Sequence, residues 1–146
     1  MQNFRNLVVW QRAHELVLEV YRSSARFPTE ERFGVTSQLR RASVSVPANI
    51  AEGARRRSGK DYAHFLNIAQ ASLAEVEYLL LLSRDLGYLQ VPTHQELEAR
   101  MRPVAGMLEA LRRRVEASRT DHLGRVSVFI LAGLSLAASA ALLFTV

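Results

Sequence analysis

Apolar residues recur at spacings of four and three along four successive stretches, and this period limits the fold more than any other feature of the chain. Residues three and four apart share one face of an α-helix, whereas strands need strict alternation. The stretches cover roughly residues 5–25 and 30–57, then run from Ser58 to Gly87 and from Thr93 past Val115. The repeating positions are Val9, Ala13, Leu16 and Val20; Val35, Leu39, Ala42, Val46 and Ile50; Tyr62, Leu66, Ala69, Leu73, Val76 and Leu80; Leu97, Met101, Val104, Leu108 and Leu111.

Breaking and capping residues separate these stretches. Pro28 ends the first, and Ser58, three residues before Asp61, is typical of a helix N-cap. Gly87 favours a helix end, and the segment 93–96 has the pattern of a capping box. Short links between amphipathic helices favour antiparallel neighbours. The sequence therefore predicts an all-α fold, an antiparallel four-helix bundle (up-down-up-down) over residues 1–118.

Composition narrows the classes of function. The chain has 146 residues, enough for one domain, and it contains no cysteine, which excludes disulfides and thiolate metal sites. Its formal net charge is +5, and Lys60 is the only lysine among its basic residues. An arginine-rich surface favours nucleic acid, anionic lipid or an acidic protein as partner.

Residues that could carry catalysis form no recognisable pattern. Glu75 and Glu77 lie two apart on a helix and point to different sides, which makes a poor carboxylate pair. The chain lacks the common nucleotide-binding, metalloprotease and hydrolase motifs. The histidines are scattered at positions 14, 64, 94 and 122. We therefore expect no enzyme activity, no metal and no cofactor.

The aromatic residues are also dispersed. Phe4, Trp10, Tyr21 and Tyr62 fall mostly on rows that face the predicted core. Base stacking needs exposed rings beside basic side chains. If nucleic acid binds, we expect contacts to backbone phosphates to dominate, with strong salt dependence and little sequence preference.

A row of polar residues flanks the apolar face of the second helix. Its members are Gln38, Arg41, Ser45, Asn49 and Glu52. The row lies about 100° from the apolar face of a 3.6-residue helix. One interpretation is a hydrogen-bond network that fixes helix pairing or a subunit contact, another is a ligand or catalytic site, and a third is a solvated surface. We favour the structural network, for which the candidates are Gln38, Ser45, Asn49 and Glu52.

Three segments carry a family resemblance. The segments LVVWQRAHELVLEVY, FPTEERFGVTSQLRRASVSVPANIAEGARRRSGKDYAHFLNIAQASLAEVEYLL and DLGYL lie in this order within about residues 4–116. Together they resemble the bacterial four-helix-bundle family of large-subunit rRNA intervening-sequence proteins. They are also similar to the accessory variability determinant of diversity-generating retroelements. The resemblance implies a homopentameric barrel of four-helix subunits, and in the retroelement members a basic surface that binds nucleic acid and reverse transcriptase.

The resemblance also assigns residues. It implies that Asn49, Glu52 and Gly53 are architectural, because they match the signature S-V-P-A-N-I-A-E-G at 45–53. The basic cluster that it implies consists of Arg40, Arg41, Arg55, Arg56, Arg57 and Lys60. Guanidinium groups fit phosphate oxygens, so the cluster is a candidate nucleic-acid-binding site. The alternative is a solvated face, paired with Glu30, Glu31, Glu52 or Asp61.

The C-terminal segment 126–146 contains no charged residue. As a helix it would span about 30 Å, the thickness of a bilayer core. Gly133, Ala137 and Ala141 recur at a spacing of four, which allows close helix approach in membranes. We predict a transmembrane helix joined to the bundle by a basic linker at 119–125; the alternative is an apolar helix buried in a soluble assembly. The candidate lipid-headgroup residues are Arg112, Arg113, Arg114, Arg119 and Arg125.

These observations combine into one expected function and one alternative. The expectation is a non-enzymatic homo-oligomer that binds nucleic acid or another polyanion through a basic face. Positive charge before the apolar segment predicts a tail anchor in the inner (cytoplasmic) membrane, with the bundle in the cytoplasm. The alternative is a membrane-anchored scaffold that binds anionic lipid and an unidentified protein partner, without nucleic acid. The apolar segment has no counterpart in the family core, so the resemblance implies nothing about it.

Overall fold

The computed structural model describes the backbone of residues 3–143 and the side chains of residues 3–118, and within them it is entirely helical. The four α-helices are α1 (Val8–Ser24), α2 (Val35–Gly53), α3 (Gly59–Asp85) and α4 (Val91–Leu143). Two short 3-10 helices, η1 (Phe4–Asn6) and η2 (Thr29–Phe33), precede α1 and α2. The predicted all-α class is confirmed.

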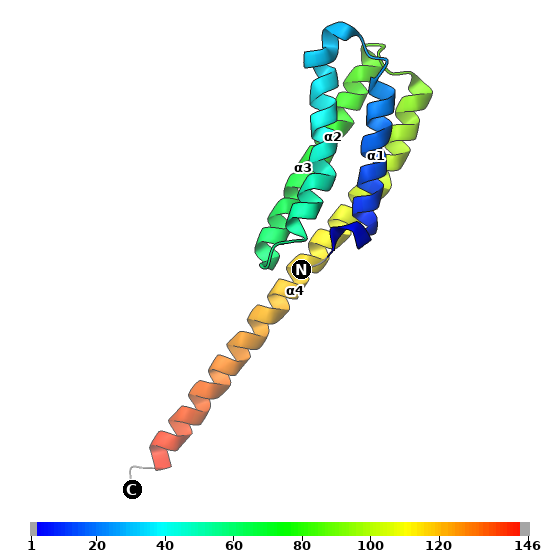
Figure 1. Ribbon diagram of the computed structural model, residues 1–146. Coiled ribbons are helices and arrows are strands. Elements are labelled where there is room, and N and C mark those ends of the chain that lie inside the picture. The colour runs from blue at the N-terminus through cyan, green and yellow to red at the C-terminus, as the bar shows by residue number, and fades with distance from the viewer. Residues whose placement is uncertain (1–2, 144–146) are drawn as a thin grey trace.

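The helices form a square, antiparallel bundle. α1 packs on α2 and α4, and α3 packs on the same two helices. Figure 1 shows that successive helices run in opposite directions, so that η1, the α2–α3 link and the exit of α4 lie at one end of the bundle. We call this end the exit end. The predicted up-down-up-down four-helix bundle is therefore confirmed.

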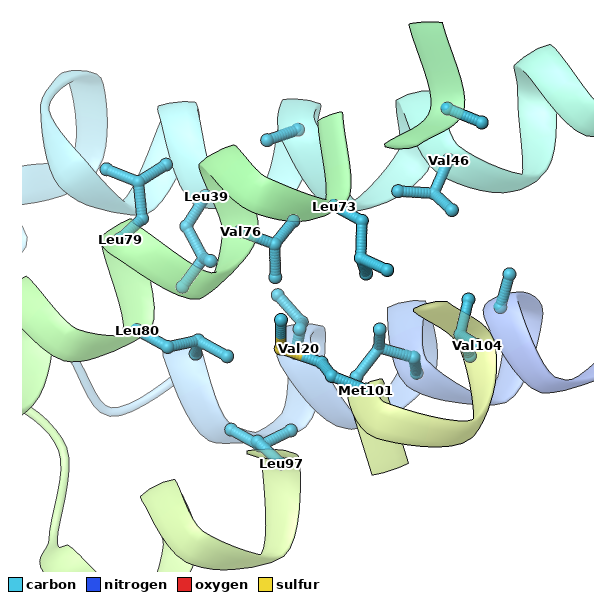
Figure 2. Packing of buried hydrophobic residues seen from close by; sticks show 14 of the residues in the cluster. Val20, Leu39, Val46, Leu73, Val76, Leu79, Leu80, Leu97, Met101 and Val104 are labelled. Atoms are coloured by element: carbon cyan, nitrogen blue, oxygen red, sulfur yellow. The ribbon is translucent and has the colours of Figure 1, made fainter. Parts of the chain in front are cut away.

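The core consists of the apolar faces that the sequence period predicts. Leu16, Ile50, Leu66 and Leu108, one from each helix, are fully buried. Figure 2 shows side chains from different helices meeting in the middle of the bundle. Labelled there are Val20, Leu39, Val46, Leu73, Val76, Leu79, Leu80, Leu97, Met101 and Val104. Burial of such side chains contributes roughly 1.5–3 kcal/mol each and is the main force that holds the four helices together.

The second helix is shorter than predicted at both ends. It begins at Val35 rather than near residue 30, because Gly34 has φ −96° and ψ −123°, which are not helical values. The Val35 N–H instead donates to Glu31 Oε2 at 3.0 Å, which satisfies one of the free donors of the first turn. The helix ends at Gly53 rather than at residue 57, so the arginine run 55–57 lies in a loop. Similarly, the first helix begins at Val8, after η1, and not at residue 5.

The two predicted ends of the third helix are confirmed. Ser58 Oγ accepts hydrogen bonds from the backbone N–H of Lys60 at 3.1 Å and of Asp61 at 3.3 Å, so Ser58 is the N-cap. At the other end Gly87 has φ +77°, a left-handed conformation that glycine adopts without strain. Ser58 and Gly87 thus fix the length of α3.

The fourth helix differs from the prediction in its start and its length. It begins at Val91, so Thr93 lies inside the first turn and is not its cap. The helix continues without interruption to Leu143, so residues 119–125, the predicted basic linker, have helical backbone; that they act as a linker stays a prediction. Figure 1 shows its second half extending beyond the exit end. The predicted transmembrane segment 126–146, together with Arg119 and Arg125, lies outside the residues whose side chains the structure describes.

Among the described residues, α3 also has the length and composition of a membrane-crossing helix. Within its most apolar stretch, however, 39% is buried inside the bundle, and core helices of soluble proteins commonly share this composition. Its core face carries Leu66, Leu73 and Leu80, while Tyr78 and Leu81 on the other side are 60% and 39% exposed. α3 is therefore a core helix that also presents an apolar outer face.

Candidate functional site

The arginines of the α2–α3 link follow shortly after Gly53, which packs closely against α3. A β-carbon at Gly53 would lie 2.8 Å from Cδ2 of Tyr62 and 3.0 Å from Cβ of Phe65. Contacts this short leave space for glycine alone, so α2 can end here directly against α3. Arg55, Arg56 and Arg57 follow in the turn and are exposed, and Lys60 is exposed in the first turn of α3. The structure thus brings four of the six predicted nucleic-acid-binding residues together.

The three arginines of this turn differ in their contacts. Arg56 forms an ion pair with Glu52, and its guanidinium lies over the ring of Phe65 at 4.6 Å. Arg55 lies over the ring of Phe4 at 5.6 Å. Arg57 and Lys60 form no ion pair within residues 3–118. Glu52 therefore neutralises one of these four positive charges, as the alternative interpretation of the cluster expects.

The remaining two residues of the predicted cluster lie elsewhere on α2. Arg40 Nε donates to Ser24 Oγ at 2.8 Å, and its guanidinium lies 4.8 Å from the centre of the Tyr21 ring. Both partners are on α1, so Arg40 joins two helices. Arg41 lines a groove between α2 and α3 beside Glu75. From Arg41, α2 continues for twelve residues to Gly53, which is about 18 Å along the helix axis, and Arg55 lies in the turn beyond it.

A second group of residues extends the basic link toward the N-terminus. Phe4, in η1, packs edge-on against Trp10 with 4.9 Å between ring centres, and Trp10 stacks on His14 at 5.3 Å with 3° between the planes. The guanidinium of Arg5 lies over the Phe4 ring, 4.9 Å from its centre. Gln11 holds η1 in place, because its Nε2 donates to the Arg5 carbonyl at 2.9 Å.

Sequence reasoning missed this group. It treated Phe4 and Trp10 as dispersed residues on core-facing rows. Trp10 does pack against the core, whereas Phe4 is half-buried beside Arg5 and Arg55. A local signal was present, since Trp10 and His14 are four residues apart on one helix face and Arg5 follows Phe4 directly. The contact with Arg55 had no such signal, because it joins distant parts of the chain. Tyr21 is also 43% exposed and does not face the core.

The polar row of α2 lies mostly against α3. Gln38 Nε2 donates to Glu75 Oε1 at 3.2 Å, and the hydroxyl groups of Ser45 and Ser72 are 2.9 Å apart. Asn49 Nδ2 donates to Ser45 Oγ at 2.9 Å and to the Ser45 carbonyl at 2.8 Å. The Gln38–Glu75 and Ser45–Ser72 bonds connect α2 to α3. Of the four candidates for the structural network, Gln38 and Ser45 thus bond to α3, Asn49 bonds to Ser45 within α2, and Glu52 pairs with Arg56 just beyond the end of α2.

The arginines predicted to meet lipid headgroups are partly neutralised by neighbouring glutamates. Arg112 donates to Glu109 at 3.0 Å and to Glu116 at 2.8 Å, and Arg113 Nε donates to Glu109 at 2.6 Å. Hydrogen bonds from Gln70, Arg113 and Arg112 lower the pKa of Glu109 from its ordinary 4.5 to about 2. Arg114 is exposed and forms no ion pair with another described side chain.

Groups that could support catalysis do not gather in the described part of the chain. No cluster of three or more His, Asp or Glu side chains there could hold a metal ion. His94 is buried, with Nδ1 3.8 Å from Glu98 Oε2, and His14 packs on Trp10. Burial raises the pKa of Tyr62, whose hydroxyl has no hydrogen-bond partner in the structure. His14, His94 and Tyr62 thus lie apart from one another, and each is packed against other side chains of the bundle.

Known structures share this fold. A crystal structure of a protein with unknown function from the S23 ribosomal protein family of Bacteroides thetaiotaomicron VPI-5482 matches with a TM-score of 0.68 and 23% sequence identity. The match covers 73% of this chain and 96% of that chain. At this identity the likeness shows the fold alone. The comparison with curated protein sequences gives no match.

The sequence itself matches a family model. The model describes the 23S rRNA-intervening sequence protein, and it matches residues 5–110, from the η1 residue Arg5 through the buried part of α4. This range contains the α2–α3 link, the signature segment 45–53 and all three segments that carry the resemblance. The chain therefore belongs to the 23S rRNA-intervening sequence protein family.

Proposed function

We propose that this protein is a non-enzymatic, homo-oligomeric helical protein that binds nucleic acid or another polyanion and is anchored to a membrane by its C-terminal segment. The proposal is carried by the gathering of Arg5, Arg55, Arg56, Arg57 and Lys60 at the exit end. Glu52 neutralises Arg56, and the other charges remain open to solvent. Phosphate groups are suitable partners for such a group of guanidiniums.

The outer face of α3 supports self-association. Ala71, Ala74, Tyr78 and Leu81 lie along this face and are exposed in the single subunit. Exposed apolar residues that recur along one helix face are typical of a protein–protein interface. A second copy is the occupant that we propose, with five subunits as the family resemblance implies.

The tail anchor rests on the sequence of 126–146 and on the direction of α4. The segment has no charged residue, and arginines precede it. Because α4 leaves the bundle at the exit end, an inserted tail would turn that end toward the cytoplasmic face of the membrane.

This geometry also favours the alternative function. If the tail crosses a bilayer, the exit end faces the anionic headgroups, and the α2–α3 link at this end carries Arg57 with Lys60 directly after it. Basic residues close to a membrane span are attracted to anionic lipid. In this alternative the protein is a scaffold that binds lipid and an unidentified protein partner, without nucleic acid.

Salt-dependent binding of RNA and DNA to the full chain in nonionic detergent tests the main proposal. A variant with Arg55, Arg56 and Arg57 changed to Gln should lose most of the affinity, with a shallower dependence on salt. No binding by the wild type at low salt would contradict nucleic-acid binding and favour the scaffold.

Flotation with liposomes tests the anchor by comparing the full chain with residues 1–118, which contain every member of the buried cluster. The full chain should float and the shorter chain should not. A full chain that remains soluble without detergent would contradict the anchor. Mass measurement of the shorter chain tests assembly, because a monomer would mean that the bundle does not associate by itself.

A further inference from the structure

A solvent-open hollow lies between η1 and the last turn of α2, at the exit end. It is lined by Phe4, Ala51, Glu52, Arg55 and Arg56 and has a volume of about 530 Å³. Hollows of roughly 300–1,000 Å³ are of a size that holds small ligands such as a nucleotide. It therefore offers more than a flat charged surface.

The lining combines three kinds of group. Phe4 contributes an aromatic ring, with the guanidiniums of Arg5 and Arg55 at 4.9 Å and 5.6 Å from its centre. Unpaired bases stack on aromatic rings and on guanidinium planes, and both are present here. Arg55 supplies a cationic donor for a phosphate, while Arg56 is paired with Glu52, whose carboxylate can also accept a hydrogen bond from a base amino group or a sugar hydroxyl.

We propose that this hollow, which we call the Phe4 hollow, receives an unpaired base, so that the nucleic acid bound at the exit end is single-stranded. The inference rests on the proposed nucleic-acid binding and adds the class of nucleic acid. In a duplex the faces of the bases are stacked inside the helix and cannot reach Phe4. A duplex would therefore contact only the charged side chains at the exit end, whereas a single strand would gain the stacking contact as well.

The contacts of Phe4 hold its ring in place. The Trp10 ring lies at 63° to it, so the two rings are not stacked in parallel. The guanidiniums of Arg5 and Arg55 lie over the Phe4 ring, and a stacking base would take the place of one of these exposed side chains. Gln11 fixes the position of η1 through the Arg5 carbonyl. A ring that is already positioned loses little conformational entropy when a base binds.

The test compares a single-stranded RNA of about 12 nucleotides with the duplex of the same sequence, using fluorescence anisotropy and the full chain in nonionic detergent. Trp10 is the only tryptophan and lies 4.9 Å from Phe4, so its emission reports on this site directly. The single strand should bind more tightly than the duplex and should quench Trp10. The duplex should leave Trp10 emission unchanged.

Phe4→Leu should weaken single-strand binding about ten-fold and leave duplex binding unchanged, because leucine is apolar but cannot stack. Phe33→Leu is the matched control, since Phe33 is 88% exposed at the opposite end of the bundle. Arg55→Lys is a second variant that keeps the charge and removes the guanidinium plane. Arg55→Lys should also weaken binding of the single strand more than binding of the duplex. It provides an independent test if Phe4→Leu lowers the melting temperature of the protein.

Each outcome separates this inference from the proposed function. Equal binding of single strand and duplex, with no selective loss in Phe4→Leu or Arg55→Lys, overturns the Phe4 hollow and leaves charge-based binding intact. No binding of either RNA, with binding to vesicles that contain anionic lipid, overturns both and supports the scaffold. Single-strand preference that falls in both variants, but not in Phe33→Leu, supports both.

Discussion

The backbone of Gly53 lies directly against the ring of Tyr62, so that a β-carbon on Gly53 would be 2.8 Å from Cδ2 of that ring. This contact joins the last turn of α2 to the first turn of α3. It explains in physical terms why a glycine closes the family signature at 45–53. It also positions the arginine turn that follows.

Gly53→Ala should therefore destabilise the bundle, by about 1–3 kcal/mol, because the added methyl group forces the Tyr62 ring or the helix end to move. Gly106→Ala is a matched control, since no atom lies within 4 Å of a β-carbon there. That change should stabilise α4 by about 0.5–1 kcal/mol. Urea unfolding of residues 1–118, followed by circular dichroism, measures both, and equal effects of the two changes would contradict the close contact.

The hydroxyl contact between Ser45 and Ser72 should appear as a coupling energy. Each single change to alanine should cost about 0.5–1.5 kcal/mol, and the double change should cost less than the sum by about 0.5–1 kcal/mol. Ser37 is the control on the same helix, because it forms no side-chain hydrogen bond within residues 3–118. Additive effects for Ser45 and Ser72, as expected for Ser37 and Ser72, would mean that the contact contributes nothing.

Arg40 and Arg57 should separate stability from binding. Arg40→Gln removes the bond to Ser24 and the contact with Tyr21, so it should cost about 1 kcal/mol of stability and leave nucleic-acid affinity unchanged. Arg57→Gln should leave stability within about 0.5 kcal/mol and reduce the slope of log affinity against log salt by about one. Melting curves and salt titrations measure these effects. A reversed pattern would place the binding surface on α1 and α2 rather than at the exit end.

Glu109 should make the bundle sensitive to acid. Its pKa in the folded protein is about 2, below the ordinary 4.5, so its contribution to stability is present above about pH 4.5 and is lost as the pH falls toward 2. Glu109→Gln should therefore be less stable than wild type at neutral pH, and the difference should disappear near pH 2. Unfolding measured at several pH values checks this. Glu96→Gln, which removes an exposed carboxylate from the same helix, is the control for the change of net charge.

The sequence predicted the helices and their buried faces because both depend on a local period. Leu16, Leu66 and Leu108 recur with neighbours three and four residues away, and burial follows from that spacing alone. The ends of α2 were wrong because they depend on contacts with other segments. Glu31 caps the start from η2, and Tyr62 limits the end from α3.

The placement of the candidate site residues was predictable only where it depends on neighbours in sequence; that they bind nucleic acid stays a prediction. Arg55, Arg56 and Arg57 are adjacent in sequence, so their proximity needed no structural information. Arg40 belonged to the same predicted cluster, but the rise of the helix separates it from them and its partners are on α1. The approach of Phe4 to Arg55 required the antiparallel pairing of α1 with α2, which no local pattern encodes.

Because α4 is continuous, the rotation of its first half about the helix axis determines the rotation of its second half. Its 53 residues form a single helix, and Leu97 and Leu108 fix the rotation of the first half by facing the core, so the backbone beyond the bundle continues in the same helical phase. Inserting one residue between 118 and 126 would rotate the distal half by about 100° and shift it by about 1.5 Å, whereas seven residues would nearly restore the phase. The rotation of the segment beyond the bundle about the helix axis is therefore determined by the packing of α4 inside the bundle.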